Sequence, residues 1–168
     1  MTLSMYQASI PVFLKTLGNL SEILRKAEAY AAAKKIDPSV LISARLAPDM
    51  FPLSRQIQIA TDATKGFAAR AAGVDVPSWP DTEATFAELQ ARIGKATDFL
   101  KTFKPEQIDG SEDKEVKLKV GGNDLTFKGQ FYLLHFAIPN FFFHVTTTYA
   151  ILRHNGLEIG KKDFLGSY

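Results

Sequence analysis

The chain has 168 residues, a length that favours one domain over residues 1–168. Its formal net charge of +2 gives no reason to expect a nucleic-acid partner, and the absence of cysteine excludes disulfides, thiolate metal sites and cysteine nucleophiles. We expect a cytoplasmic protein, because the N-terminus has no basic region followed by an apolar core and a cleavage site.

The first part of the chain has the three- and four-residue spacing of apolar side chains that indicates amphipathic helices. One long helix is predicted from Met5 to Ile36. Pro11 is tolerated if this helix begins close to it, and otherwise bends the first turns. A short helical piece is expected from Ser39 to Leu46, and a second long helix from Pro48 to Ala72, closed by Gly73.

The middle of the chain is predicted to form a loop, a third helix and a β-hairpin. Residues Val74 to Pro80 are expected to cross the bundle as an ordered loop or to cap one end of it. The third helix is expected to begin at Asp81 or Thr82 and to end at Lys104. From Glu115 to Lys128, apolar and polar residues alternate on both sides of a glycine pair, which predicts two strands joined by a tight turn.

The longest apolar stretch runs from Gly129 to Gly156 and predicts a last long helix that is buried on most sides. Pro139 lies in its middle and is expected to kink or break it. A membrane span is not expected, because polar residues interrupt the run before it reaches ~20 apolar positions. We predict that the tail packs Phe164 and Leu165 against the domain or against a second copy. The whole chain is therefore predicted to be an all-α, antiparallel four-helix bundle, with a small β-hairpin inserted before the last long helix.

One plausible polar site lies in the last helix. Asn140 and His144 are four residues apart and share a helix face. They are either a hydrogen-bonded pair in an aromatic core, which we favour, or part of a pocket in which they converge with Gln56 on a small-molecule ligand. His135 and His154 have no acidic neighbour in the sequence that indicates a catalytic dyad.

Phe141, Phe142 and Phe143 point in three directions around a helix. One of them is therefore expected to face away from its own bundle core. It is buried under the hairpin or the first helix, or it forms the interface of a homodimer, which we favour slightly because aromatic residues are common in interface cores.

Three stretches carry a resemblance to a known family: RLAPDMFPLSRQIQIATD from Arg45, PNFFFHVTTTYAILRHNG from Pro139, and IGKKDFLG from Ile159. With these motifs the chain resembles the DinB-like superfamily of four-helix bundles, which includes DNA-damage-inducible proteins and mycothiol-dependent enzymes. More narrowly, it resembles a family of bacterial proteins known only as a domain of unknown function. The resemblance implies the fold and leaves the activity open.

The superfamily often binds a divalent metal through three histidines, and the resemblance implies where they belong. His144 matches the last ligand position, but the position four residues earlier is Asn140. The second helix contains no histidine, and its polar candidates are Gln56 and, less favoured, Asp49 or Asp62. Carboxamide oxygens are weak ligands for zinc or nickel, so we expect no cofactor, with a weakly bound divalent metal as the alternative.

These observations favour a small-ligand-binding or structural homodimer without an intact three-histidine metal site. The alternative is a DinB-like metal- or thiol-dependent transferase that uses His144. Neither a nucleophilic triad nor a phosphate-binding loop is visible, so the sequence leans away from an enzyme.

Overall fold

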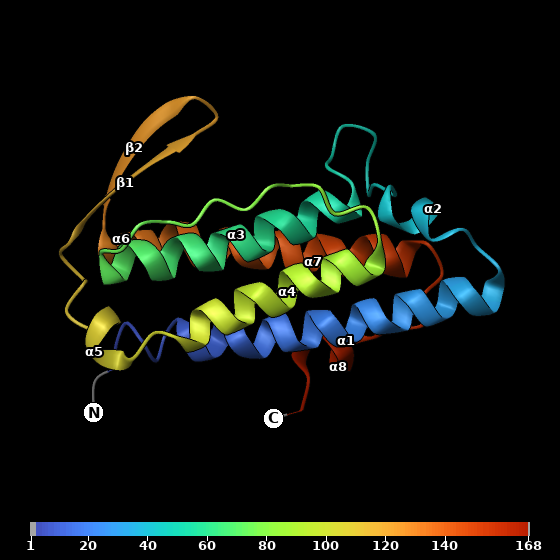
Figure 1. The fold of residues 1–168 in the computed structure, drawn as a ribbon, viewed down its shortest axis with the longest axis horizontal. Coiled ribbons are helices and arrows are strands. Elements are labelled where there is room, and N and C mark those ends of the chain that lie inside the picture. The colour runs from blue at the N-terminus through green and yellow to red at the C-terminus, as the bar shows by residue number, and fades with distance from the viewer. Residues whose placement is uncertain (1–2, 168) are drawn as a thin grey trace.

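The computed structural model describes residues 3–167, which form a helical bundle with one β-hairpin (Figure 1). The long helices are α1 (Ile10–Lys34), α3 (Leu53–Ala72), α4 (Phe86–Lys101) and α7 (Ile138–His154). The short helices are α2 (Pro38–Ile42), α5 (Pro105–Ile108), α6 (Gly129–Tyr132) and α8 (Lys161–Leu165). A π-helical turn, η1 (Leu133–Ala137), joins α6 to α7, and the hairpin consists of β1 (Glu115–Val120) and β2 (Asn123–Lys128). The predicted fold class, a helical bundle with a hairpin before the last long helix, is confirmed.

The directions of the long helices follow from the loop between α3 and α4. This loop, residues 73–85, returns the chain along the length of α3, so that α3 and α4 run in the same direction (Figure 1). The pairs α3 with α7 and α1 with α4 are antiparallel. Of the two alternatives for the loop, the structure shows the crossing loop. Among the pairs of long helices, α3 and α7 have the most extensive contact.

Helix α1 begins at Ile10, with Pro11 in its first turn, where a missing backbone donor costs nothing. The predicted start of the second long helix at Pro48 is wrong, because the helix begins at Leu53 after an extended Pro52. At its end, Gly73 adopts the left-handed conformation, as predicted.

The predicted start of the third helix at Asp81 or Thr82 is also wrong. Helix α4 begins at Phe86, with Thr85 as its N-cap. The Thr85 hydroxyl accepts a hydrogen bond from the Glu88 backbone at 3.2 Å, and the Glu88 carboxylate accepts one from the Thr85 backbone at 2.9 Å. This reciprocal arrangement is a capping box, and it fixes the helix start four or five residues later than expected.

The last long helix runs from α6 through η1 into α7 without a break, so the expected kink or break at Pro139 takes the form of a π-turn just before it. Proline has no N–H, so the carbonyl of His135, four residues earlier, loses its usual donor. In the π-turn the Ile138 N–H donates to the Leu133 carbonyl, five residues back. The wider turn accommodates the proline within a continuous helix.

The predicted hairpin is present, and it pairs β1 with β2 so that Val116 lies opposite Phe127 and Val120 opposite Asn123. Gly121 and Gly122 both have positive φ, which the tight turn between the strands requires. Val116 is buried and Phe127 is half-buried and stacks on Tyr132, so one face of the hairpin lies on the helices.

The core is formed by the inward stripes of the long helices. Phe13 of α1, Phe67 of α3 and Phe141 of α7 are fully buried and meet edge to face. Phe164 of α8 packs on Phe142 and Tyr149, so the tail lies on the domain. Between residues 3 and 167, the helices are either too short or too polar to cross a membrane.

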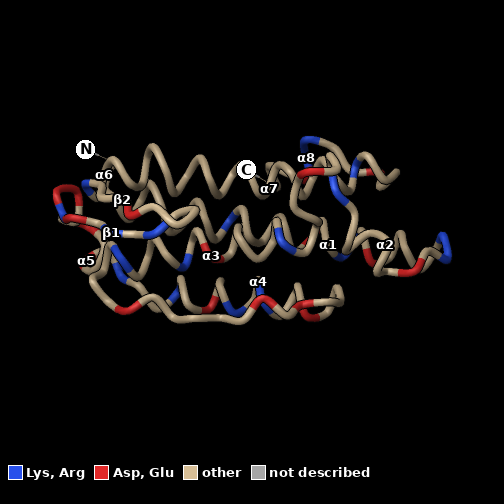
Figure 2. The backbone as a smooth tube through the Cα atoms, turned by 90° about the horizontal axis from the view of Figure 1, so that it is seen from above, with Lys and Arg blue, Asp and Glu red and all other residues tan. Residues whose placement is uncertain are grey.

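Charged residues of both signs are spread along the bundle, but α7 contains almost none (Figure 2). Arg153, in its last turn, is the one Lys, Arg, Asp or Glu residue between Ile138 and His154. Helix α7 therefore presents apolar and neutral polar groups to its surroundings along nearly its whole length.

Candidate functional site

The site is built around a hydrogen bond between the second and the last long helix. His144 of α7 is buried, with 8% of its surface exposed, and its Nδ1 lies 2.6 Å from Oε1 of Gln56 on α3. The Gln56 amide nitrogen donates to the Phe51 carbonyl at 2.9 Å, which fixes the orientation of the amide. Because Gln56 Oε1 can only accept, His144 Nδ1 carries the hydrogen, and its Nε2 carries a lone pair.

The imidazole of His144 is neutral at physiological pH. Burial and, as a smaller contribution, the nearby Arg55 guanidinium together lower its pKa to about 4. Within residues 3–167, Nε2 accepts no hydrogen bond from another side chain or from the backbone. The arrangement therefore offers a neutral, oriented hydrogen-bond acceptor.

Gln56 has a different role from the one expected. Both polar ends of its side chain are used inside the protein, by His144 and by the Phe51 carbonyl. It therefore orients the imidazole, and it has no amide group left for a ligand.

The predicted hydrogen-bonded pair of Asn140 and His144 is wrong. Asn140 lies one helical turn before His144 and is half-buried, but no hydrogen bond joins their side chains in the described part of the chain. His144 turns toward α3, where Gln56 supplies a better placed acceptor. Asn140 instead lines a groove beside the pair.

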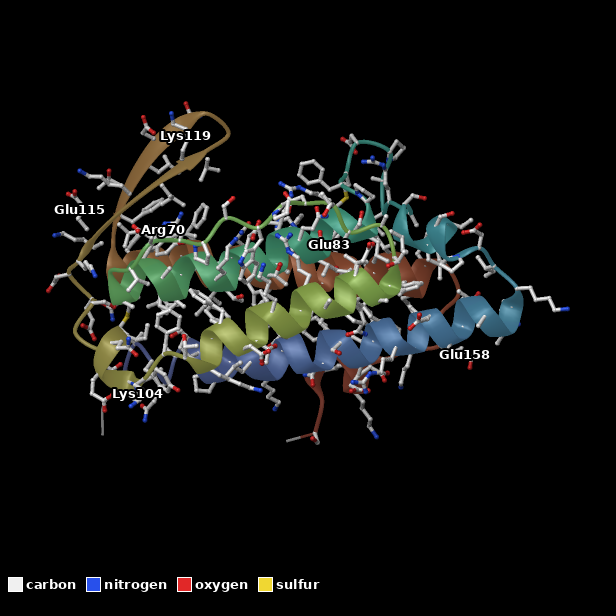
Figure 3. All side chains as sticks on the ribbon, in the orientation of Figure 1. Arg70, Glu83, Lys104, Glu115, Lys119 and Glu158 are labelled. Atoms are coloured by element: carbon white, nitrogen blue, oxygen red, sulfur yellow. The ribbon has the colours of Figure 1, made fainter. Side chains whose placement is uncertain are left out.

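This groove has a volume of about 430 Å³ and lies between α3, α7 and the tip of the hairpin. Its walls are both apolar and polar, and Figure 3 shows Arg70 beneath the hairpin that carries Lys119. The lining side chains are those of Arg55, Ile59, Asp62, Ala63 and Arg70 from α3, Leu118, Lys119 and Val120 from β1, Gly121, and Tyr132, Phe136 and Asn140 from the last helix. Asn140 lies on the same helix face as His144, one turn closer to the hairpin.

A buried network of charges holds the loop of residues 73–85 against α3 and α4. The Arg92 guanidinium, 1% exposed, contacts Asp62, Asp81 and Glu83 at 3.0 to 3.1 Å. It also donates to the Thr61 hydroxyl and to the Pro80 carbonyl. Asp62 additionally pairs with Lys65 at 2.6 Å, so its carboxylate is already neutralised within the protein.

The structure does not bring together a transition-metal site of the superfamily kind. Within the described range, 3–167, His, Cys, Asp and Glu side chains do not gather in groups of three that could hold a metal ion. Asp49 is exposed and Asp62 is paired with Lys65 and Arg92. His144 is thus the one strong donor at the site, and this donor set does not fit a tightly held zinc or nickel ion.

The other two histidines lie away from the site. His135 is exposed in the π-turn and stacks on Phe131 with 4.3 Å between ring centroids. His154 is exposed in the last turn of α7, where a cation suits the helix C-terminus.

The sequence reasoning missed Arg55, Arg70 and Tyr132. Arg55 directly precedes Gln56 in one of the motifs that carry the family resemblance. Its closeness to His144 could have been predicted from the proposed position of Gln56. Arg70 and Tyr132 are 62 residues apart and meet only in the folded chain. No local pattern could have paired them.

Fold and site together define a DinB-like helical bundle, with an oriented histidine between the second and the last long helix. A crystal structure of a DinB family member protein from Shewanella denitrificans has the same fold, with a TM-score of 0.87 and 41% sequence identity. The similarity covers 97% of this chain and 92% of that chain. The protein belongs to the family described as a domain of unknown function, DUF1993, which matches residues 5–165. No protein of curated function matches the chain.

Proposed function

We propose that this DinB-like protein binds a small organic molecule in the groove between α3 and α7, in the cytoplasm, and acts as a homodimer. The observation that carries the proposal is the neutral His144, whose tautomer is set by Gln56 and whose Nε2 has no partner among residues 3–167. A purely structural histidine has no need of a fixed tautomer with a free acceptor. The groove of about 430 Å³ is lined as far as Asn140, one helical turn before His144, and it is large enough for a small ligand.

Native mass spectrometry of the untagged protein tests the binding. We expect wild-type protein to carry a small molecule that is released on denaturation, and His144→Leu to carry less of it because the hydrogen-bond acceptor is gone. His154→Leu is the matched control, since this histidine lies on the same helix but is exposed. Protein without any bound molecule in all three forms contradicts the proposal.

Exposed aromatic side chains on the outer side of the last helix support the homodimer. Phe131 is 52% exposed, Leu134 is 46% exposed and Phe143 is 55% exposed. Exposed side chains of this kind are favoured at the centre of protein interfaces. Light scattering is expected to give twice the chain mass for wild-type protein and the chain mass for Phe143→Ser. A wild-type monomer at high concentration contradicts the dimer.

The second candidate is a DinB-like metal- or thiol-dependent transferase that uses His144. The same unprotonated Nε2 favours it, since the lone pair of a neutral imidazole can bind a metal ion or accept a proton. Metal analysis of protein purified without a histidine tag separates the candidates. Stoichiometric metal that is lost in His144→Ala favours the transferase, and metal-free protein with full ligand binding excludes the metal-dependent form.

A further inference from the structure

The end of the groove nearest the hairpin holds an arginine in an unusual position. Arg70 lies in the last turn of α3, and its guanidinium folds back over Gly66, one turn earlier. A Cβ at Gly66 would lie 2.5 Å from Nη1 of Arg70, so the glycine leaves the space that the guanidinium occupies. From there Nη1 donates a hydrogen bond to the Tyr132 hydroxyl at 3.3 Å.

Arg70 has no acidic partner among residues 3–167. In the part of the chain that the structure describes, Arg55 and Arg92 pair with carboxylates, but no carboxylate lies within 4.0 Å of Arg70. Arg70 is also not needed to cap the C-terminal end of α3. Lys114 already donates a hydrogen bond there, to the Ala71 carbonyl at 3.2 Å. A half-buried guanidinium with one hydrogen bond therefore keeps most of its donors free.

Tyr132 adds a second free donor at the same place. The ring is only 3% exposed, and its oxygen accepts from Arg70, but its own hydrogen has no acceptor between residues 3 and 167. Burial raises the pKa of the Tyr132 hydroxyl, so this hydrogen is present at physiological pH. Two kinds of donor, guanidinium N–H and phenol O–H, thus meet at one end of the groove.

The rest of the groove is suited to an apolar body. Phe136 and Ile59 line it from the helices, and Leu118 and Val120 line it from the hairpin. Asp62 also reaches the groove, but its charge is neutralised by Lys65 and Arg92.

We propose that the Arg70–Tyr132 end of the groove binds the anionic group of a small amphipathic molecule, whose aromatic or aliphatic body lies along Phe136 and the hairpin. The anion is a carboxylate, sulfonate or phosphate, because these groups have several oxygens that can accept hydrogen bonds from a guanidinium and a phenol together. This inference rests on the proposed binding function and adds the chemical class of the ligand.

Two fluorescent probes of nearly the same shape test the proposal. 8-Anilinonaphthalene-1-sulfonate carries a sulfonate, and N-phenyl-1-naphthylamine has the same aromatic body without the charge. We expect the full-length wild-type protein to bind the sulfonate probe about tenfold more tightly than the neutral probe, which is the effect of one charge-assisted hydrogen-bond site. Arg70→Met should remove this preference and leave the affinity for the neutral probe unchanged, while Arg70→Lys should keep part of it.

Matched controls locate the binding. Lys95→Met removes a cation of α4 that lies over Trp79, outside the groove, and should leave both affinities unchanged. Phe143→Ser removes part of the exposed aromatic surface and should also leave them unchanged. Tyr132→Phe keeps the ring and removes only the hydroxyl, and a severalfold loss for the sulfonate probe alone is expected.

The outcomes separate the two proposals. Equal affinity for both probes, with no effect of Arg70→Met, overturns the anion site but leaves ligand binding in the groove standing. Binding of neither probe overturns both. Binding of the sulfonate probe that is lost in Phe143→Ser, but kept in Arg70→Met, assigns the probe to the outer surface and overturns the inference.

Discussion

A single glutamine determines the chemistry that His144 can perform. Because the Gln56 amide is tied to the Phe51 carbonyl, its oxygen must face the imidazole, and the imidazole must donate to it through Nδ1. A glutamate at the same position would hold the same geometry but favour the imidazolium. The neutral amide therefore keeps His144 an acceptor at Nε2.

The low pKa of His144 makes the stability of the protein depend on pH in a defined window. The folded-state pKa of about 4 lies below the ordinary value of 6.5, so the unfolded chain binds more protons between these two values. Stability is therefore expected to fall as the pH decreases from 6.5 toward 4, by at most about 3 kcal/mol, and to be unaffected by this group above pH 6.5.

Urea unfolding of wild-type protein and of His144→Gln over this pH range measures the effect. The difference in the free energy of unfolding between the two proteins should change as the pH falls, at the expense of the wild type. Only the wild type has an imidazole at this position, and its unfolded state takes up a proton there at a higher pH than its folded state does. A constant difference would mean that His144 titrates normally in the folded protein.

At the same scale, the sequence placed His144 and Gln56 in one predicted site, and the two side chains do meet, but it gave Asn140 the wrong partner. Spacing along one helix shows which residues share a face and not which way a side chain turns. The partner of His144 lies 88 residues away in the sequence, and the pairing depends on how α3 and α7 pack.

At the scale of elements, the helices were predicted well where local signals decide their ends. Gly73 and the Gly121-Gly122 pair marked a helix end and a turn correctly, because positive φ is a local requirement. The start of α4 was misplaced because Asp81 and Glu83, which suit a helix first turn, serve another purpose. They face Arg92 in the folded protein, and this long-range pairing leaves no trace in the local pattern.

The junction between β2 and α6 depends on one glycine. A Cβ at Gly129 would lie 1.9 Å from the backbone carbonyl oxygen of Ser111, which cannot move without shifting the chain. Gly129→Ala is therefore expected to destabilise the protein by about 3 kcal/mol, near the upper end of the range for overpacking. Thermal and urea unfolding measure the loss.

Gly94→Ala provides the control for this substitution. Gly94 is exposed inside α4 and has open space around it, so alanine should stabilise the helix by roughly 0.5–1 kcal/mol. If both substitutions change stability in the same direction, contact with Ser111 does not explain the requirement for Gly129.

At the scale of the molecule, the parallel arrangement of α3 and α4 depends on the loop that returns along α3. Arg92 joins this loop to both helices, since its partners come from α3 (Thr61, Asp62) and from the loop (Pro80, Asp81 and Glu83). Trp79 packs beside it, with the Lys65 ammonium 4.3 Å from the ring centre. The network therefore fixes the order in which the long helices pack.

Arg92→Met is expected to lower the free energy of unfolding by about 3 kcal/mol, because it leaves Glu83 without a cation beside the carboxylates of Asp62 and Asp81, which keep one each. This loss of stability is at the low end of the range for breaking a buried ion pair, because the carboxylates are partly exposed to solvent. Arg25→Met, which breaks an exposed pair with Glu22, is the control and should cost no more than about 0.5 kcal/mol. Equal effects of the two variants, measured by urea unfolding, would show that burial does not strengthen the network.

The π-turn has a consequence for the geometry of the groove. In a regular α-helix, residues four apart drift by about 40° around the axis at each step, so a row of them slowly winds away from a neighbouring helix. Tyr132, Phe136, Asn140 and His144 nevertheless all face α3, because the wider turn of η1 offsets this drift. The last helix thus contains one residue more than a regular α-helix would have between the same two ends. Shortening it by His135 should keep the segments on either side in phase, whereas removing one residue from the middle of α1 should rotate half of its apolar stripe out of the core.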